Sequence, residues 1–376
     1  MSQLKVNSIS DSAGANGNAI TLASDGSCTV KATNRSNRNL VINGGMNVNQ
    51  YGSASSTSTG RKIFDRWNPG WNAGTITQSK ETLTSGGAYD AGHRSCLRLT
   101  NTSAAGSGAG TYVEVWYKWE AQDIAKSGWN YKSASSYITL SFWLRSSVAQ
   151  TYSCTIQTRD GTKYFHPFTA VISSVNTWTK ITKTFAGNSN LQIDDDNGDG
   201  LMMWVNPMQG SNFHNASWNT DGWFAESGSS LFAGTTDTTW GTTAGATWDI
   251  TGFQLEVGDV ASDYSHEPYN ETLRKCQRYY WQIDEGGYVM LPKNGYFESH
   301  SYPYPVKMRA NPNITSNNSW VIRELNAGSN LSYSGLTTHN YSTRFYMSST
   351  TTNNSNFHMF IIGADATNPL KFSAEF

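Results

Sequence analysis

The strongest constraint on the fold is a two-residue alternation of side chains between residues 137 and 144. The apolar members of this run are Ile138, Leu140, Phe142 and Leu144. The positions between them are Tyr137, Thr139, Ser141 and Trp143. Because successive side chains of a strand point to opposite faces, the pattern predicts an antiparallel strand with one face on a core and one toward solvent.

Similar runs continue from Asn39 to about Tyr269, separated by turns rich in Gly, Ser and Thr. Charged residues make up 15% of the chain, whereas Gly (34), Trp (14) and Tyr (19) are abundant. Aromatic and β-branched residues suit a pleated, half-buried surface, and Gly and Asn suit tight turns. About eight such strands predict an all-β fold, a two-sheet sandwich of the jelly-roll type.

The pattern divides the chain into three units. Residues 1–35 hold short strand-like runs that are too few to bury a core alone, so they are predicted to form an N-terminal attachment or oligomerisation segment. Residues 36–275 form the jelly-roll and end in a short helix with Asn270 as its N-cap. Residues 276–376 are predicted to form a smaller C-terminal β-sandwich.

Composition excludes several classes of partner. The net charge is −1 without a basic cluster, which argues against nucleic acid, because binding to it depends on Lys and Arg along a phosphate backbone. No apolar run approaches a membrane span, and the first residues lack the apolar core of a secretion signal, so we expect synthesis in a cytoplasm. The isolated residues Cys28, Cys96, Cys154 and Cys276 are expected to be free thiols, mostly buried.

No common catalytic motif is present, and we predict that the chain is not an enzyme. The nearest set of acids for glycoside cleavage is Glu114, Glu120 and Asp123. That chemistry needs two carboxyl groups about 5 to 10 Å apart across a sugar. Glu114 alternates with Trp116 on a strand-like run, so it is expected to be a solvated surface residue.

The stretch DDDNGDG at residues 194–200 is a candidate calcium-binding loop. Asp195, Asn197 and Asp199 match the first half of an EF-hand loop and would be the ligands of a Ca²⁺ ion. The position of the bidentate Glu is occupied by Asn206, and the flanking segments are strand-like. A polar turn between two strands is the alternative interpretation.

Five tryptophans lie in glycine-rich loops rather than strands. They are Trp67, Trp71, Trp218, Trp223 and Trp240. Flat aromatic rings beside amide and hydroxyl groups suit a sugar, so these residues are predicted to bind glycan, with the ring of Trp223 turned outward by a tight turn. The alternative is that the rings hold the loops against the sandwich or fill a subunit interface.

Three stretches carry a resemblance to a known family. They are NLVINGGMNVNQYG followed by FDRW, the stretch WDITGFQLEVGDVASDYSHEPYNETLRKCQRYYW, and YPYPVKMRANPNIT. Together they resemble surface proteins of tailed bacteriophages, common among phages of cyanobacteria, with a jelly-roll like that of carbohydrate-binding modules. Where that family often has Arg between Gln and Gly, this chain has Tyr51.

The resemblance implies a structural virion component, usually a homotrimer, made in the host cytoplasm and mounted on other virion proteins by its N-terminal segment. The function it favours is that of a tail fibre or fibre-like appendage that attaches to host surface polysaccharide. One alternative is a head decoration, head fibre or tail-assembly protein without a specific ligand. A third is a polysaccharide depolymerase.

Overall fold

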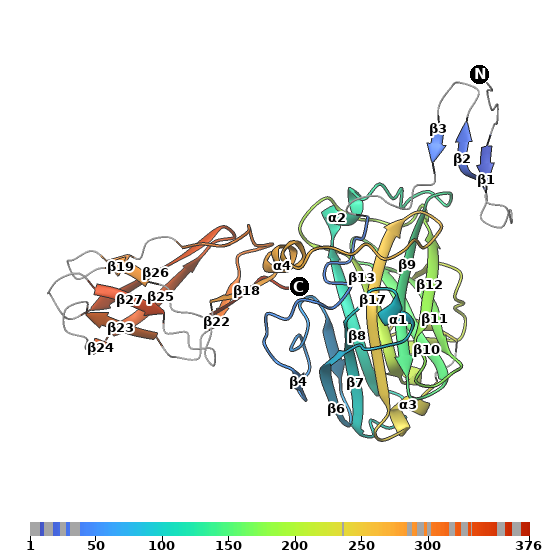
Figure 1. Cartoon of the computed structure of the whole chain (residues 1–376), viewed down its shortest axis with the longest axis horizontal. Helices are drawn as coiled ribbons and strands as arrows, with labels where there is room; N and C mark the ends of the chain where they lie inside the picture. Colours follow the sequence, from blue (N-terminus) through green and yellow to red (C-terminus); the bar gives the residue numbers. More distant parts are fainter. Residues whose placement is uncertain are drawn as a thin grey trace.

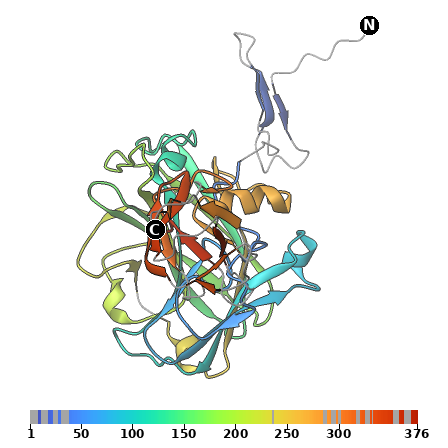
Figure 2. The ribbon, with the colours of Figure 1, turned by 90° about the vertical axis from the view of Figure 1, so that its left-hand side faces the viewer.

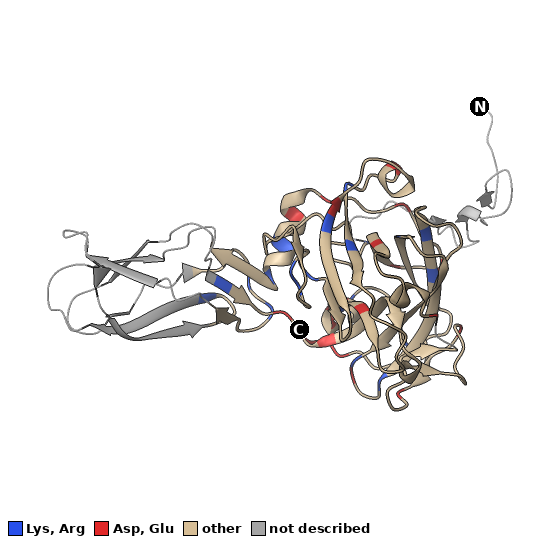
Figure 3. Ribbon diagram, turned by 90° about the horizontal axis from the view of Figure 1, so that it is seen from below, with Lys and Arg blue, Asp and Glu red and all other residues tan. Residues whose placement is uncertain are grey.

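The computed structural model describes residues 38–234, 237–283, 303–315, 341–344 and 371–376 in full, and the backbone of further strands in the N- and C-terminal regions. Its elements are nearly all strands, joined by turns and a few short helices (Figure 1). No helix in this part of the chain is long and apolar enough to cross a membrane. Lys and Arg are interspersed with Asp and Glu and do not gather on one face (Figure 3).

Two six-stranded antiparallel sheets form the sandwich. The first sheet has the order β15-β11-β10-β13-β8-β5. Its strands are β5 (Asn68–Trp71), β8 (Tyr112–Glu120), β10 (Gln150–Thr158), β11 (Tyr164–Ile172), β13 (Asp199–Gln209) and β15 (Phe224–Ala225). The second has the order β12-β9-β17-β7-β6-β4. Its strands are β4 (Ser55–Ser56), β6 (Thr75–Thr82), β7 (Ser95–Ser103), β9 (Tyr137–Ser146), β12 (Thr179–Ala186) and β17 (Thr247–Val257).

The core lies between these sheets and confirms the alternation seen in the sequence. On β9 the four apolar side chains are at most 1% exposed, namely Ile138, Leu140, Phe142 and Leu144. Phe142 stacks on Phe253 of β17 with ring centroids 4.5 Å apart. From the first sheet, Val113 and Val115 of β8 enter the same core. The prediction of an all-β sandwich of the jelly-roll class is therefore confirmed.

Short elements cover the ends and outer faces of the two sheets. They are α1 (Gly87–Asp90), α2 (Ala121–Ala125), the 3-10 turn η1 (Ser211–Phe213), β14 (His214–Asn215), β16 (Phe232–Ala233) and α3 (Thr239–Thr242). The ribbon β14–β16 belongs to the loop between β13 and α3 and lies against β10 and β11. This loop therefore covers part of the outer face of the first sheet.

The helix α4 (Tyr269–Gln277) follows the sandwich and begins one residue before the predicted cap, without a side-chain cap. Beyond it, β18 (Tyr280–Ile283), β28 (Leu370–Ser373) and β22 (Asn313–Thr315) form a small sheet in that order. The other C-terminal strands are β19 (Tyr288–Leu291), β20 (Phe297–Glu298), β21 (Tyr302–Pro303), β23 (Trp320–Glu324), β24 (Asn330–Leu331), β25 (Tyr333–Asn340), β26 (Arg344–Thr351) and β27 (His358–Ile362). The C-terminus lies at the junction with the sandwich (Figures 1 and 2).

At the other end of the chain, β1 (Ser8–Ser10), β2 (Asn18–Leu22) and β3 (Cys28–Val30) form a three-stranded antiparallel sheet. The side chains of residues 1–37, including the thiol of Cys28, lie outside the described residues. The other three cysteines are free and buried, as the sequence predicts. The role of residues 1–35 in attachment or oligomerisation stays a prediction.

Candidate functional site

Two of the five loop tryptophans lie inside the sandwich. Trp67 is 1% exposed and Trp240 is 0% exposed, and both belong to the main core. The indole N–H of Trp67 donates to the carbonyl of Asn43 at 3.0 Å. A ring enclosed on both faces has no surface on which a sugar can stack. The prediction that Trp67 and Trp240 bind glycan is therefore wrong.

The aromatic rings of the long loop between β13 and α3 pack this loop against the sandwich. Trp218 is 9% exposed and stacks on Phe224, with centroids 5.2 Å apart, in a second apolar cluster on the outer face of the first sheet. The indole N–H of Trp223 donates to the carbonyl of Ala186 at 2.8 Å, and its ring meets His166 edge-on at 5.2 Å. Trp223 thus turns toward the sandwich, and the prediction that its ring points outward is wrong.

Trp71, the last residue of β5, is half-buried and packs against the main core. All five rings therefore have packing partners in the sandwich. The alternative interpretation, in which the rings anchor loops, describes their positions better than glycan stacking does. The residue types alone could not separate the two, because burial depends on which distant strand each loop covers.

A different group of polar side chains meets at a β-bulge on the outer face of the first sheet. Val205 pairs with Val115, and Met208 pairs with Val113, so the register shifts between these two pairs. Two residues of β13, Asn206 and Pro207, consequently oppose the single residue 114 of β8. Bulges of this kind redirect a side chain and often lie at functional sites. Pro207 within a strand-like run is the sequence signal for such a bulge.

Glu114 is half-buried at this bulge, on the face away from the core, because its neighbours Val113 and Val115 face inward. Burial raises the pKa of Glu114 to about 7, and a hydrogen bond from the amide of Gln209, at 3.4 Å, opposes part of that rise. Near neutral pH this carboxyl group therefore exchanges between its ionised form, which only accepts hydrogen bonds, and its protonated form, which also donates one.

Asn206, opposite Glu114, is 1% exposed, and neither atom of its side-chain amide has a hydrogen-bond partner in the described part of the chain. A buried polar group without a partner costs about 1 to 3 kcal/mol of stability. Such an orphaned amide is a common sign of a place where water or a ligand belongs. The amide supplies two donors and an acceptor at one point of the sheet.

Aromatic rings flank these polar groups. Trp116 lies two residues after Glu114 on β8 and is half-buried. The guanidinium of Arg61 lies 4.9 Å from the centroid of its ring. Tyr112, two residues before Glu114, meets Phe213 edge-on at 5.9 Å. We define the bulge site as Glu114, Asn206 and Gln209 with Tyr112 and Trp116. Rings beside groups that both donate and accept hydrogen bonds match the apolar faces and hydroxyl edges of a sugar.

Two of the acids weighed for glycoside cleavage, Glu114 and Glu120, do not form a pair. Glu114 and Glu120 lie six residues apart on the same strand, which corresponds to about 20 Å at the usual rise per residue. Glu120 is 0% exposed and accepts two hydrogen bonds of 2.6 Å from the guanidinium of Arg278. Asp123 is exposed. Glu114 is half-buried, so the expectation that it is a solvated surface residue is wrong.

The predicted calcium ligands interact with protein groups instead. Asp195 pairs with Lys126 at 2.6 Å, and Asp199 pairs with Lys118 at 2.8 Å and Arg159 at 2.9 Å. The amide of Asn197 donates to the carbonyl of Arg309. Within the described residues there is no group of three or more His, Cys, Asp or Glu that could hold a metal ion. These contacts favour the alternative interpretation, in which the stretch is a polar turn that carries ion pairs.

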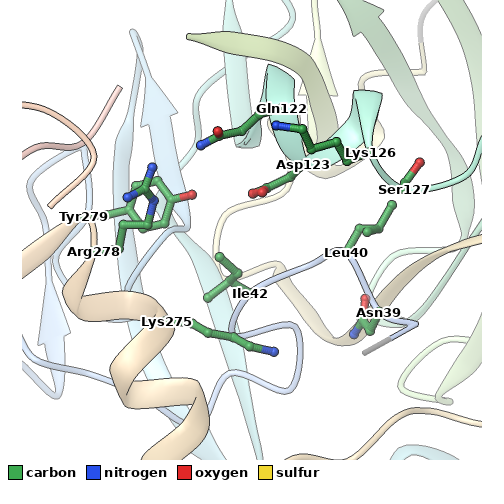
Figure 4. A pocket seen from close by; sticks show the side chains of 10 residues that line it. All are labelled: Asn39, Leu40, Ile42, Gln122, Asp123, Lys126, Ser127, Lys275, Arg278 and Tyr279. Carbon is green, nitrogen blue, oxygen red and sulfur yellow. The ribbon is translucent and has the colours of Figure 1, made fainter. Parts of the chain in front are cut away.

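A cavity of about 530 Å³ lies between the segment 39–42, α2 and α4. Asp123 of α2 and Lys275 of α4 line it from opposite sides (Figure 4). Its basic side chains are engaged elsewhere, Lys275 with Glu267 and Arg278 with Glu120. We interpret this cavity as part of the junction between the sandwich and the C-terminal strands.

No protein-family model matches the chain, and no curated protein matches it. Among solved structures, an enzymatically active domain of a tailspike protein from bacteriophage CBA120 has a TM-score of 0.31 and 10% identity, over 59% of this chain and 22% of that one. A putative sugar-binding protein from Bacteroides thetaiotaomicron has a TM-score of 0.30 and 11% identity, over 58% and 100%. A family 11 carbohydrate-binding module from Clostridium thermocellum, in complex with a mixed-linked tetrasaccharide, has a TM-score of 0.26 and 11% identity, over 54% and 91%. These scores are low, and the fold assignment rests on the sheets and the core.

Proposed function

We propose that this chain is a carbohydrate-binding virion protein of a tailed phage, and that the bulge site binds a sugar of a host surface polysaccharide. The observation that supports the sugar-binding part is the set of half-buried side chains at the bulge, Glu114 with Tyr112 and Trp116, beside the buried amide of Asn206, which has no partner among the described residues. Sugar hydroxyls both donate and accept, so they satisfy an amide and a carboxyl that exchanges its proton near neutral pH.

The assignment to a phage virion rests on the resemblance of the three sequence stretches. In this proposal the chain is a tail fibre or fibre-like appendage that forms a homotrimer and is mounted on other virion proteins through residues 1–35. Imaging of particles labelled with an antibody to this chain separates tail from head. Light scattering on the full chain, and on a version that starts at Asn39, tests the trimer, and a full-length monomer at micromolar concentration contradicts it.

An architectural role without a specific ligand is the second candidate. The observation that favours it is the packing of Trp218 and Trp223, which makes the long loop a cover for the first sheet instead of an aromatic binding surface. A depolymerase is the third candidate. It is disfavoured because Glu114 and Glu120 lie six residues apart on β8 and Glu120 pairs with Arg278.

The sugar-binding part is tested with two variants of the bulge site, Asn206→Leu and Glu114→Gln. Leu has a similar size to Asn and removes the unpaired amide, so the fold of Asn206→Leu should be as stable as the wild type or more stable. Binding to host polysaccharide, measured by surface plasmon resonance with the full chain, should fall about tenfold or more in both variants. Asn190→Leu, at an exposed asparagine elsewhere, is the matched control. Unchanged binding in both variants overturns the bulge site and favours the architectural role.

A further inference from the structure

A second cavity, of about 500 Å³, lies on the outer face of the second sheet, between α1 and the segment 263–266. Ser141 and Trp143 of β9 line it, and they alternate with Phe142 and Leu144, which face the core. The cavity therefore lies on the opposite side of the sandwich from the bulge site. Its volume is within the range of about 300 to 1,000 Å³ that is typical of small-molecule sites.

Two glycines leave room for the indole of Trp143 in this cavity. A Cβ atom added at Gly87 of α1 would lie 2.8 Å from the six-membered ring of Trp143. A Cβ added at Gly252 of β17 would lie 2.9 Å from the Cδ1 atom of the same indole. Gly252 also has a φ of +67°, which side chains other than glycine rarely adopt. The backbone at Gly87 and at Gly252 thus packs closely against the half-buried indole, which lines the cavity.

His93 supplies an unsatisfied polar atom beside this surface. Its side chain is 3% exposed, and its Nε2 atom has no hydrogen-bond partner in the described residues. A Cβ added at Gly252 would lie 2.5 Å from this Nε2, so the nitrogen faces a residue that lines the cavity. Burial, with smaller contributions from His266, Arg94 and Lys180, lowers the pKa of His93 to about 4, so the imidazole is neutral at neutral pH.

Three exposed charged residues, Asp90, Lys180 and Asp263, form the rim of the cavity. None of their side chains takes part in an ion pair or side-chain hydrogen bond with a described residue, in contrast to the paired charges around the first cavity. The rim therefore offers two carboxylates as acceptors and one ammonium group as a donor. The excess of one carboxylate disfavours an acidic ligand.

We propose that this cavity is a second carbohydrate site, which binds one neutral or amino sugar unit with its apolar face on Trp143. The carboxylates of Asp90 and Asp263 accept hydrogen bonds from ring hydroxyls, and Lys180 contacts sugar oxygens. The site is independent of the bulge site, because the two lie on different sheets and share no residue. One chain with two separate sites gains avidity for a repeating polysaccharide.

The test uses the full chain with ¹⁵N-labelled tryptophan and methyl β-D-glucopyranoside as the probe. The indole N–H resonance of Trp143 is assigned by its loss in Trp143→Phe. Titration to about 50 mM should shift this resonance in a saturable way. Methyl glucuronide, which carries a carboxylate, should bind more weakly than the neutral glucoside. No saturable shift of the Trp143 resonance with the glucoside overturns the proposal, as does tighter binding of the glucuronide.

The double variant Asp90→Asn with Asp263→Asn changes only exposed side chains and should weaken the glucoside about tenfold. Asp259→Asn, at an exposed carboxylate outside the cavity, is the matched control. Asn206→Leu should leave this titration with the monosaccharide unchanged, so failure of the bulge site and failure of this cavity are distinguished. Equal affinity in the double variant and the wild type overturns the proposal.

Discussion

The guanidinium of Arg66 and the carboxylate of Glu375 form an ion pair of 2.6 Å between residues 309 positions apart in the chain. The Arg66 side chain is 1% exposed, donates to the carbonyl of Lys118 at 2.6 Å and lies 3.5 Å from the ring centroid of Tyr279. The stretch Asp65-Arg66-Trp67 therefore joins the sandwich to the end of the chain. Trp67 anchors the stretch in the core, and Arg66 pairs with Glu375 at the junction of the sandwich with the C-terminal strands.

We expect the loss of this pair to weaken the junction strongly. Removing one partner of a buried pair leaves the other charge without compensation and costs about 3 to 5 kcal/mol. Arg66→Met and Glu375→Gln should each lower stability, and the double variant should lose less than the sum of the two. Thermal unfolding of all four proteins measures this coupling. The exposed pair of Lys163 and Glu226, at 3.3 Å, is the control, and its removal should change little. Additive effects of the two junction variants would contradict a direct interaction.

Asp65, next to Arg66, is expected to make stability depend on pH. Burial raises the pKa of its carboxyl from 3.8 to about 7, although hydrogen bonds from Gln50 oppose the rise. The folded state then holds a proton that the unfolded state releases between these two values. The contribution of this group is fully present below about pH 4 and is lost as the pH rises toward 7.

The measurement compares the melting temperature of the wild type and of Asp65→Asn from pH 4 to pH 7. The difference isolates Asp65 from His93 and His166, whose pKa values burial lowers to about 4 and which therefore favour folding as the pH rises. The wild type should lose stability relative to the variant across this interval. A constant difference would mean that Asp65 titrates at its ordinary value in the fold.

Trp223→Ala is expected to affect stability more than ligand binding. The indole packs against the core and hydrogen-bonds Ala186, so truncation opens a cavity. The cost should be about 3 kcal/mol, the lower end of the range for buried tryptophans, because this ring is only half-buried. Thermal unfolding and polysaccharide binding are measured on the same variant, with Trp223→Phe as the milder control. Full stability combined with lost binding would restore the glycan interpretation of this loop.

Calcium is expected to leave stability unchanged. A ligand that binds only the folded state raises the melting temperature as its concentration exceeds the Kd. Asp195 and Asp199 already pair with Lys126, Lys118 and Arg159. Melting curves in a chelator and in millimolar calcium should therefore coincide. A higher melting temperature in calcium that disappears in Asp199→Asn would show that the ion displaces these pairs.

The sheets could be predicted because their signal is local. The alternation from Tyr137 to Leu144 fixes which side chains of β9 face the core, and the structure places them there. The loop tryptophans could not be predicted in this way. The backbone N–H of Trp240 donates a hydrogen bond to the side-chain oxygen of Gln150, 90 residues earlier, and no local pattern around Trp240 predicts that contact.

The sequence does not predict the bulge site, for a related reason. Glu114 and Asn206 are separated by more than 90 residues, and only the register between β8 and β13 brings them face to face. Pro207 within the run LMMWVNPM was a local sign of irregular pairing, but a bulge alone does not reveal its opposite residue. Trp143, by contrast, occupies a position of the local alternation that points away from the core, and it lines the second cavity.

The pairing of β18 with β28 sets Tyr280 opposite Ser373, and Ile283 opposite Leu370. The polypeptide leaves this small sheet after Ile283 and returns to it twice, at β22 and at β28. A foreign domain with adjacent ends, inserted at the end of β18, leaves β22 and β28 paired and keeps the contacts of Arg66 and Glu375 available. Protein engineering therefore has a point of insertion at the end of β18.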